Sequence, residues 1–238
     1  MRCLVFNGWA AGPETWRLCT FPHDWMFDYV EQLDGLPEKV MESFDEVVLV
    51  GFSMGGSTAL RMWLKYPEKV KGLVLVSATP CMMEEKVEKR GGGGDARGDQ
   101  GPVGWKGMSE RRLAALRLGT RMTFRDDPSP MYDERNMERG LEYLKNTDLR
   151  KDLESLTARP AVAPYHSSEI SDSRPPIPVW IFQSERDGIV RPNNAEFLKR
   201  VFPQAQVTMV LGNEHVLPIT VPELIDAAVK EVLTKGEP

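Results

Sequence analysis

The six residues Gly51-Phe52-Ser53-Met54-Gly55-Gly56 constrain the fold of this chain more than any other stretch. They follow an apolar run at 47–50 and precede a segment at 57–64 that favours a helix. A serine with glycines two residues before and two after it, between a strand and a helix, is typical of a turn too tight for side chains. Such a turn would expose Ser53 Oγ at a helix N-terminus, where main-chain N–H groups face developing negative charge. The sequence therefore predicts a nucleophilic serine.

A serine nucleophile requires a base, and histidine can take its proton near neutral pH. The chain has only three histidines: His23, His166 and His215. His215 follows a strand-like run at 207–211 and a short turn, so it would project from a loop at the carboxyl end of a strand. We predict that His215 is the base and that the other two are ordinary surface or loop histidines.

The carboxylate that orients the base should lie between the serine and the histidine in chain order, just after a strand. A buried strand is expected at 179–182, and in the loop behind it Asp187 precedes a glycine. Asp187 would accept a hydrogen bond from His215 Nδ1–H and leave Nε2 free for Ser53. Glu185 and Asp172 are the alternatives, although Glu185 would lie on the other side of the turn and Asp172 falls in a Ser/Pro-rich segment.

Ester and amide chemistry also needs N–H donors for an oxyanion, one after the nucleophile and one from the loop behind the first strand. That strand is expected at 4–6, and Asn7-Gly8-Trp9 is the loop. The predicted donors are the backbone N–H groups of Trp9 and Met54. The alternative for Asn7-Gly8-Trp9 is a plain turn.

The order of the predicted elements favours one α/β domain with a mostly parallel sheet and crossover helices. Further strands are expected at 25–29 and 73–76, and helices after Ser53 and near 193–201 and 222–233. A strand that begins at residue 4 leaves no room for a signal peptide or for an antiparallel N-terminal hairpin.

One long segment should interrupt this core. Residues 1–80 and 165–238 are expected to form the core, and 81–164 a helical cap with helices at 108–124 and 134–145. Within the cap, 90–104 contains four consecutive glycines and too little apolar surface to offset ordering, so we expect it to be mobile.

Composition excludes several classes of function. With a formal net charge of −5 and a pI near 5.4, the chain lacks the basic footprint of a nucleic-acid-binding protein. The mean hydropathy is −0.36 and no apolar run is long enough to span a membrane. The three cysteines are odd in number and lack metal-ligand spacing, which is typical of reduced thiols in a cytoplasm. We expect a cytoplasmic protein with no cofactor, no metal, no nucleic-acid partner and no membrane.

The serine turn, the late aspartate and the last histidine together resemble the α/β-hydrolase fold over nearly the whole chain. A narrower resemblance is to the carboxylesterases of biotin synthesis that cleave pimeloyl-acyl carrier protein methyl ester. It is carried by Asn7-Gly8-Trp9, Phe52-Ser53-Met54-Gly55-Gly56, Ser77-Ala78-Thr79-Pro80-Cys81, Gly140-Leu141-Glu142-Tyr143-Leu144 with Thr147-Asp148-Leu149-Arg150, and Asp187-Gly188-Ile189-Val190. Asn7 departs from the pattern, which usually has histidine there.

The resemblance implies that Ser53, Asp187 and His215 form a catalytic triad, that Trp9 and Met54 donate to the oxyanion, and that cap arginines receive an acidic acyl carrier protein. The cap arginines are Arg117, Arg121 and Arg125, which recur every four residues on a predicted helix. A solvated basic face, neutralised by nearby acidic residues, is the alternative.

The leading hypothesis for function is a serine carboxylesterase for a small ester with a short or medium acyl chain. Phe52 and Phe124 are expected to line its pocket together with other apolar side chains, although cap residues of this kind also pack a cap on a sheet. Hydrolysis of a thioester or of a carbon–carbon bond by the same triad is an alternative, because the triad does not encode the leaving group. A hydrolase-like binding protein without catalysis is the third.

Overall fold

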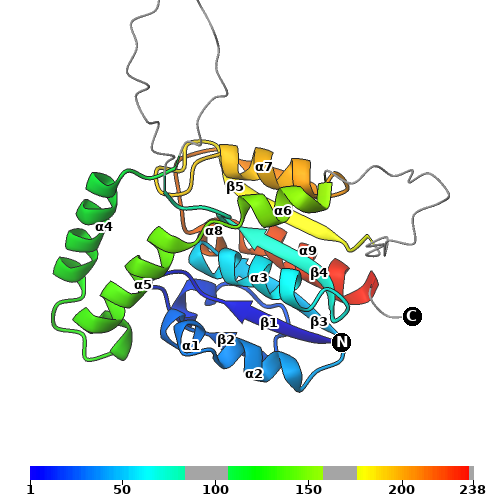
Figure 1. The fold of residues 1–238 in the computed structure, drawn as a ribbon, viewed down its shortest axis with the longest axis horizontal. Coiled ribbons are helices and arrows are strands. Elements are labelled where there is room, and N and C mark those ends of the chain that lie inside the picture. The colour runs from blue at the N-terminus through cyan, green and yellow to red at the C-terminus, as the bar shows by residue number, and fades with distance from the viewer. Residues whose placement is uncertain (84–106, 158–175, 236–238) are drawn as a thin grey trace, which may run out of the picture.

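The fold is built on a six-stranded sheet in which every described strand pair is parallel (Figure 1). The structure is a computed structural model that describes residues 1–83, 107–157 and 176–235. The spatial order is β2-β1-β3-β4-β5-β6. The strands are β1 (Arg2–Phe6), β2 (Trp25–Phe27), β3 (Val47–Phe52), β4 (Val70–Val76), β5 (Val179–Ser184) and β6 (Gln206–Val210). The predicted α/β class without an antiparallel hairpin is confirmed for the described residues.

Both faces of the sheet are buried, because side chains of each strand alternate between two apolar clusters. In β3, Val47 and Leu49 belong to one cluster, and Val48 and Val50 to the other. The first cluster is covered by α2 (Leu36–Glu42), α3 (Met54–Lys65), α6 (Arg150–Thr157) and α7 (Asn193–Val201). The second is covered by η1 (Pro13–Trp16), α8 (Leu217–Thr220) and α9 (Pro222–Lys235).

The chain between β4 and β5 contains α4 (Glu110–Thr123), η2 (Pro130–Tyr132), α5 (Glu134–Asn146) and α6. We call α4, η2 and α5 the cap, because Leu153 of α6 belongs to the first core cluster. Side chains cap the N-termini of α4 and α5. Ser109 Oγ accepts a hydrogen bond from Arg112 N, and Asp133 Oδ1 accepts from the first-turn N–H groups of α5. Figure 1 shows α4 at the outer side of α5, away from the sheet. Both cap helices agree with the prediction.

The predicted strand at 25–29 is too long. It ends at Phe27, because Asp28 caps a short helix, α1 (Tyr29–Leu33). The Asp28 side chain accepts from Glu31 N at 2.9 Å, and the Glu31 side chain accepts from Asp28 N at 3.1 Å. This capping box diverts the chain from strand to helix.

Several expectations fall outside the described residues: the mobility of 90–104, the place of the cap boundary at 164, and the positions of His166 and Asp172. Among the helices that are described, the longest have 14 residues, and none is long and apolar enough to cross a membrane.

Candidate active site

Ser53 lies in a strained turn between β3 and α3. Its backbone has φ 53° and ψ −118°, which is unusual for a residue with a side chain, and its N–H donates to Val76 O at 3.0 Å. A Cβ at Gly51 would lie 2.6 Å from Gly55 O, and one at Gly55 would lie 2.1 Å from Phe6 O. Only glycine fits at these two positions, so the sequence Gly51-x-Ser53-x-Gly55 is what allows the turn.

The structure brings three predicted residues together. His215 Nε2 lies 3.0 Å from Ser53 Oγ, and His215 Nδ1 lies 2.8 Å from Asp187 Oδ2. An ionised carboxylate can only accept a hydrogen bond, so Nδ1 carries the ring proton and Nε2 is the acceptor that faces the serine hydroxyl. Ser53 and Asp187 are buried, and 13% of the His215 side chain is exposed. The arrangement can withdraw a proton from Ser53 when the hydroxyl attacks an electrophile.

Sheet topology explains this convergence. Ser53 follows β3, Asp187 follows β5 and His215 follows β6, and in a parallel sheet all carboxyl ends meet at one edge. The backbone of His215 is fixed from β4, because Ser77 Oγ donates to His215 O at 2.9 Å. The Phe52 ring packs 5.1 Å from the imidazole, centroid to centroid. Ser77 was not predicted as a site residue; the signals for it were its position at a strand end and its place in one of the segments that carry the narrower resemblance.

Asp187 is held by the loop that carries it. Its Oδ1 accepts from Ile189 N at 2.7 Å and from Val190 N at 3.0 Å. Glu185, the alternative carboxylate, is exposed, and its backbone N–H pairs with Val210 O. The structure therefore brings Asp187, and not Glu185, to the imidazole.

The predicted oxyanion donors lie in two segments that meet beside Ser53. A Cβ at Gly8 would lie 3.1 Å from Ser53 Cβ, so the loop behind β1 is in contact with the serine. Within the described residues, neither Trp9 N–H nor Met54 N–H donates to a protein acceptor. Both groups are thus available to a ligand, as the prediction requires.

Buried side chains hold this loop on its inner side. Asn7 is fully buried, its Nδ2 donates to Phe27 O at 3.0 Å, and its Oδ1 accepts from Trp16 Nε1 at 2.7 Å. Asn7 O accepts from Gln32 Nε2 at 2.8 Å, and Gln32 Oε1 accepts from Thr58 Oγ1 at 2.8 Å. Every contact is between buried partners, so the network is rigid and specifies one loop conformation.

The cap holds the loop on its outer side. The Trp9 indole Nε1 donates to Met137 O in α5 at 3.2 Å. Gly140, one turn further along α5, allows the indole to pack directly on the helix backbone, since a Cβ there would lie 2.4 Å from Trp9 Cδ1. The position of the cap and the position of the loop behind β1 are therefore linked through Trp9.

An apolar layer lies between cap and sheet; we call it the cap–core layer. It contains Trp9 and Met54 from the core, Leu113 and Leu116 from α4, and Val190 from the Asp187 loop. Methionines contribute heavily, and the members include Met54, Met82, Met83, Met108 and Met131. Phe124 does not belong to this cluster. Its ring stacks on Tyr132 with centroids 4.0 Å apart, so it packs within the cap.

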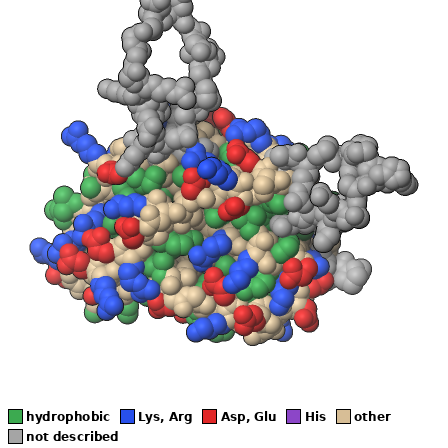
Figure 2. All heavy atoms as spheres, in the orientation of Figure 1, with side chains coloured by type: hydrophobic (Ala, Val, Ile, Leu, Met, Phe, Trp, Pro, Cys, Tyr) green, Lys and Arg blue, Asp and Glu red, His purple; other side chains and the backbone are tan. Residues whose placement is uncertain are grey.

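The three cap arginines do not form an unpaired ridge. Arg117 forms an ion pair with Glu138, and Arg121 Nη1 lies 2.8 Å from Glu134 Oε1. Arg125 Nε lies 3.3 Å from Asp126 Oδ2. Figure 2 shows acidic and basic side chains interspersed over the side of the molecule where α4 and α5 lie. Neutralisation was the alternative expectation, and most of the neutralising carboxylates come from α5.

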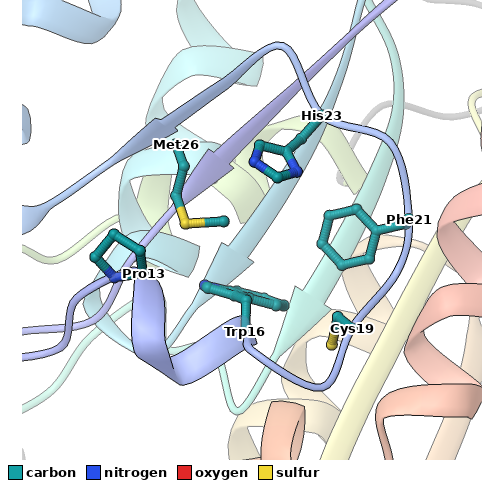
Figure 3. A pocket seen from close by; sticks show the side chains of 6 residues that line it. All are labelled: Pro13, Trp16, Cys19, Phe21, His23 and Met26. Carbon is teal, nitrogen blue, oxygen red and sulfur yellow. The ribbon is translucent and has the colours of Figure 1, made fainter.

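A separate hollow of about 360 Å³ opens beside β2 (Figure 3). It is lined by Pro13, Trp16, Cys19, Phe21, His23 and Met26. Trp16 is the link to the candidate site, because its ring packs edge-on against Phe52 at 6.4 Å. His23 is exposed and faces this hollow, so it is not placed to act on Ser53.

The remaining titratable groups do not suggest another chemistry. In the described part of the chain, no group of three or more His, Cys, Asp or Glu residues is arranged to hold a metal ion. Burial raises the pKa of Cys3 and Cys19 to about 12 and that of Cys81 to about 11, so these thiols are poor nucleophiles near neutral pH.

Comparison with known proteins identifies the family of this chain. The family model described as "alpha/beta hydrolase fold" matches residues 7–222. Curated relatives include the pimeloyl-[acyl-carrier protein] methyl ester esterases of Salmonella heidelberg (strain SL476) and Salmonella agona (strain SL483), each 32% identical over 126 residues. The aligned part is 47% of this chain and 48% of each relative, so the chain spans about half the length of the curated relatives it matches.

Solved structures with the same fold cover nearly the whole chain. A hydrolase from Oleispira antarctica has a TM-score of 0.63 and 15% identity, and covers 98% of this chain and 90% of its own. A thermophilic esterase has a TM-score of 0.61 and 15% identity, and the match covers 99% of this chain and 90% of the esterase. At these identities the likeness concerns the fold alone.

Proposed function

The chain belongs to the α/β-hydrolase family, and from that premise we propose that it is a serine carboxylesterase that uses Ser53, His215 and Asp187. The observation that carries the proposal is the pair of contacts at His215, 3.0 Å to Ser53 Oγ and 2.8 Å to Asp187 Oδ2. They give the serine a base, and the base an orienting carboxylate, in a buried site.

In the acylation step, Ser53 Oγ attacks the ester carbonyl carbon while its proton passes to His215 Nε2. The carbonyl oxygen becomes negatively charged and accepts from the N–H groups of Trp9 and Met54. Asp187 stabilises the imidazolium that forms. The tetrahedral intermediate then collapses: the bond to the alcohol oxygen breaks, this oxygen takes the proton from Nε2, and the acyl group remains on Ser53.

The deacylation step repeats these events with water in place of the serine hydroxyl. His215 Nε2 takes a proton from a water molecule, whose oxygen attacks the acyl carbon, and the same two N–H groups stabilise the second oxyanion. The bond to Ser53 Oγ breaks, Oγ recovers the proton and the carboxylic acid leaves.

We infer that the acyl chain of the substrate lies in the cap–core layer. This layer reaches the site from both sides, because Met54 follows the nucleophile and Val190 follows the acid. An apolar layer confined beneath a cap favours short and medium acyl chains over the long chains of lipids. The relatives are named for pimeloyl-[acyl-carrier protein] methyl ester, and we propose this ester as the physiological substrate.

The first experiment is labelling with a fluorophosphonate, which reacts with an activated serine. We expect one labelled residue, Ser53, and loss of labelling in both Ser53→Ala and His215→Ala. A chain that binds no probe yet folds normally would be a hydrolase-like binding protein.

The second experiment addresses the substrate. Expression in a biotin auxotroph that lacks its pimeloyl ester esterase should restore growth without biotin, and the Ser53→Ala variant should not. Purified enzyme should release methanol from pimeloyl-carrier-protein methyl ester. If the enzyme hydrolyses p-nitrophenyl esters but fails both tests, it is a serine esterase whose substrate is not the pimeloyl ester.

An acyl carrier protein is proposed as the partner that presents this substrate, with Arg117 and Arg121 as its contacts. Since both arginines are paired with α5, the double variant Glu134→Gln/Glu138→Gln should release them and increase the positive charge of the cap. We expect a lower KM for the carrier-linked ester, with a steeper dependence on salt, and unchanged turnover of a small p-nitrophenyl ester. Equal effects on both substrates would remove these arginines from the proposal.

A further inference from the structure

Gln183, near the end of β5, contacts the same carboxylate oxygen as His215. Its side chain is buried, and its Nε2 lies 3.3 Å from Asp187 Oδ2 and 2.9 Å from Val190 O. Resting on the proposed function, we propose that Gln183 is a positioning residue that aims the carboxylate of Asp187 at the imidazole and tempers its negative charge. No motif in the sequence marks it, because it extends an apolar strand and precedes the acid by four residues.

The orientation of the Gln183 amide follows from its neighbours. Nε2 faces Asp187 Oδ2, Val190 O and, at 3.3 Å, Ser184 O. All three are acceptors when Asp187 is ionised, so the side of the amide that faces them must be the NH₂ group. The two protons of this group thus hold the carboxylate and the returning loop together.

The carboxylate needs this second support. The N–H groups of Ile189 and Val190 fix Oδ1. Rotation of the carboxylate about this fixed oxygen would move Oδ2 out of line with His215 Nδ1. Gln183 contacts Oδ2 from the strand, while the imidazole contacts it from the loop after β6. With both oxygens held, the carboxylate has one orientation before substrate binds.

Gln183 also acts on charge. The Asp187 side chain has no exposed surface, so its charge is stabilised by N–H donors and not by water. A neutral amide donates to the carboxylate without adding a positive charge that would compete with the imidazolium. Gln183→Met removes this donor, so Oδ2 keeps more of its negative charge beside the imidazolium, and the acid limb of the pH–rate profile should move to higher pH.

The test is the pH dependence of kcat/KM for p-nitrophenyl acetate in Gln183→Met and Gln183→Glu. The first removes the donors at similar volume, and we expect kcat/KM to fall about 10-fold, since a hydrogen bond to a charged group is lost. The acid limb of the profile should move up by about half a pH unit or more. The second sets a carboxylate against Asp187, and its acid limb should move further in the same direction.

Asn194→Ala is the matched control. Asn194 is also buried, and its Nδ2 donates to Arg191 O at 2.8 Å, but among the described residues no hydrogen bond joins it to Asp187. We expect it to lower the melting temperature without moving the acid limb. If the Gln183 variants behave like Asn194→Ala, Gln183 has a structural role only and the proposal is wrong. If Gln183→Met does not fold, Gln183→Asn replaces it, because its amide is one methylene too short to reach Asp187. The same fall in kcat/KM and the same movement of the acid limb are expected.

The proton on His215 Nδ1 provides a readout that does not depend on turnover. In the wild type it should resonate at low field in the NMR spectrum, and in Gln183→Met its shift should change while in Asn194→Ala it should not. A wild-type chain without esterase activity but with this difference would contradict the proposed function and retain Gln183 as the positioning residue. Esterase activity that depends on Ser53, without this difference in the NMR shift, would support the proposed function and contradict the role of Gln183.

Discussion

Gly140→Ala tests the link between the cap and the loop behind β1 that carries Trp9. A Cβ at this position would lie 2.4 Å from Trp9 Cδ1, 2.8 Å from Trp9 Nε1 and 3.1 Å from Tyr29 Cε2. Carbon atoms in contact are comfortable at about 3.5–4.0 Å, so the indole or α5 must move by about 1 Å. The Trp9 Nε1 bond to Met137 O, now 3.2 Å, would be lost or strained.

The expected loss of stability follows from three terms. Overpacking costs about 1–3 kcal/mol and the hydrogen bond about 1 kcal/mol. Alanine is a better helix former than glycine by about 1 kcal/mol, which offsets part of this. The net loss is about 2 kcal/mol, and in a chain of this size it should lower the melting temperature by about 4–8 °C.

The effect on catalysis should be larger. Trp9 carries one of the two proposed oxyanion donors, and a displacement of about 1 Å there lowers kcat by about 100-fold. The assay is thermal unfolding by circular dichroism together with kcat for p-nitrophenyl acetate.

Gly119→Ala provides the matched control in the other long cap helix. A Cβ at Gly119 has no neighbour within 4 Å, so the helix preference acts alone and stability should rise by up to about 1 kcal/mol with kcat unchanged. If Gly140→Ala also left stability and kcat at or above their wild-type values, the contact between Trp9 and α5 would not hold the loop, and the reasoning would be refuted.

Three further predictions use separate assays. Ser53→Ala should lower kcat for p-nitrophenyl esters by a factor on the order of 10⁴ or more, and Asp187→Asn should also be severe, with circular dichroism unchanged; a near-wild-type rate in Asp187→Asn would contradict the choice of acid. kcat/KM across a series of p-nitrophenyl esters should peak at short or medium acyl chains, and a steady rise to long chains would exclude a confined layer. Burial raises the pKa of Cys3 and Cys19 to about 12 and that of Cys81 to about 11, so at pH 8 about 10⁻³ or less of each thiol is ionised. Iodoacetamide should therefore label none of the three in the native protein and all three in denaturant, as measured by mass spectrometry.

The sequence predicts the parts of this protein that depend on local pattern. The turn at Ser53 needs glycines that can be read directly, and strands buried on both faces appear as apolar runs. Because a parallel sheet gathers its carboxyl ends, chain order was enough to predict that Asp187 and His215 approach Ser53. The short helix after Phe27 was missed, since the capping box of Asp28 follows an aromatic run that resembles a longer strand.

Contacts that depend on how two elements are rotated against each other could not be predicted. The spacing of Arg117 and Arg121 fixes one face of α4, but the glutamates that pair with them lie on a different helix, whose rotation the sequence does not reveal. Gln183 is similar: it reaches Asp187 and Val190 only because the loop between them turns back over the end of its strand.

The methionines of the cap–core layer give the protein a specific chemical vulnerability. Oxidation of a thioether to a sulfoxide turns a flexible apolar side chain into a polar one. Met54, Met82 and Met108 are buried where the cap meets the sheet, whereas the strands are built mainly from aliphatic residues that peroxide does not attack. Oxidation of these methionines would therefore weaken the contact between the cap and the sheet, and with it the proposed binding of an acyl chain.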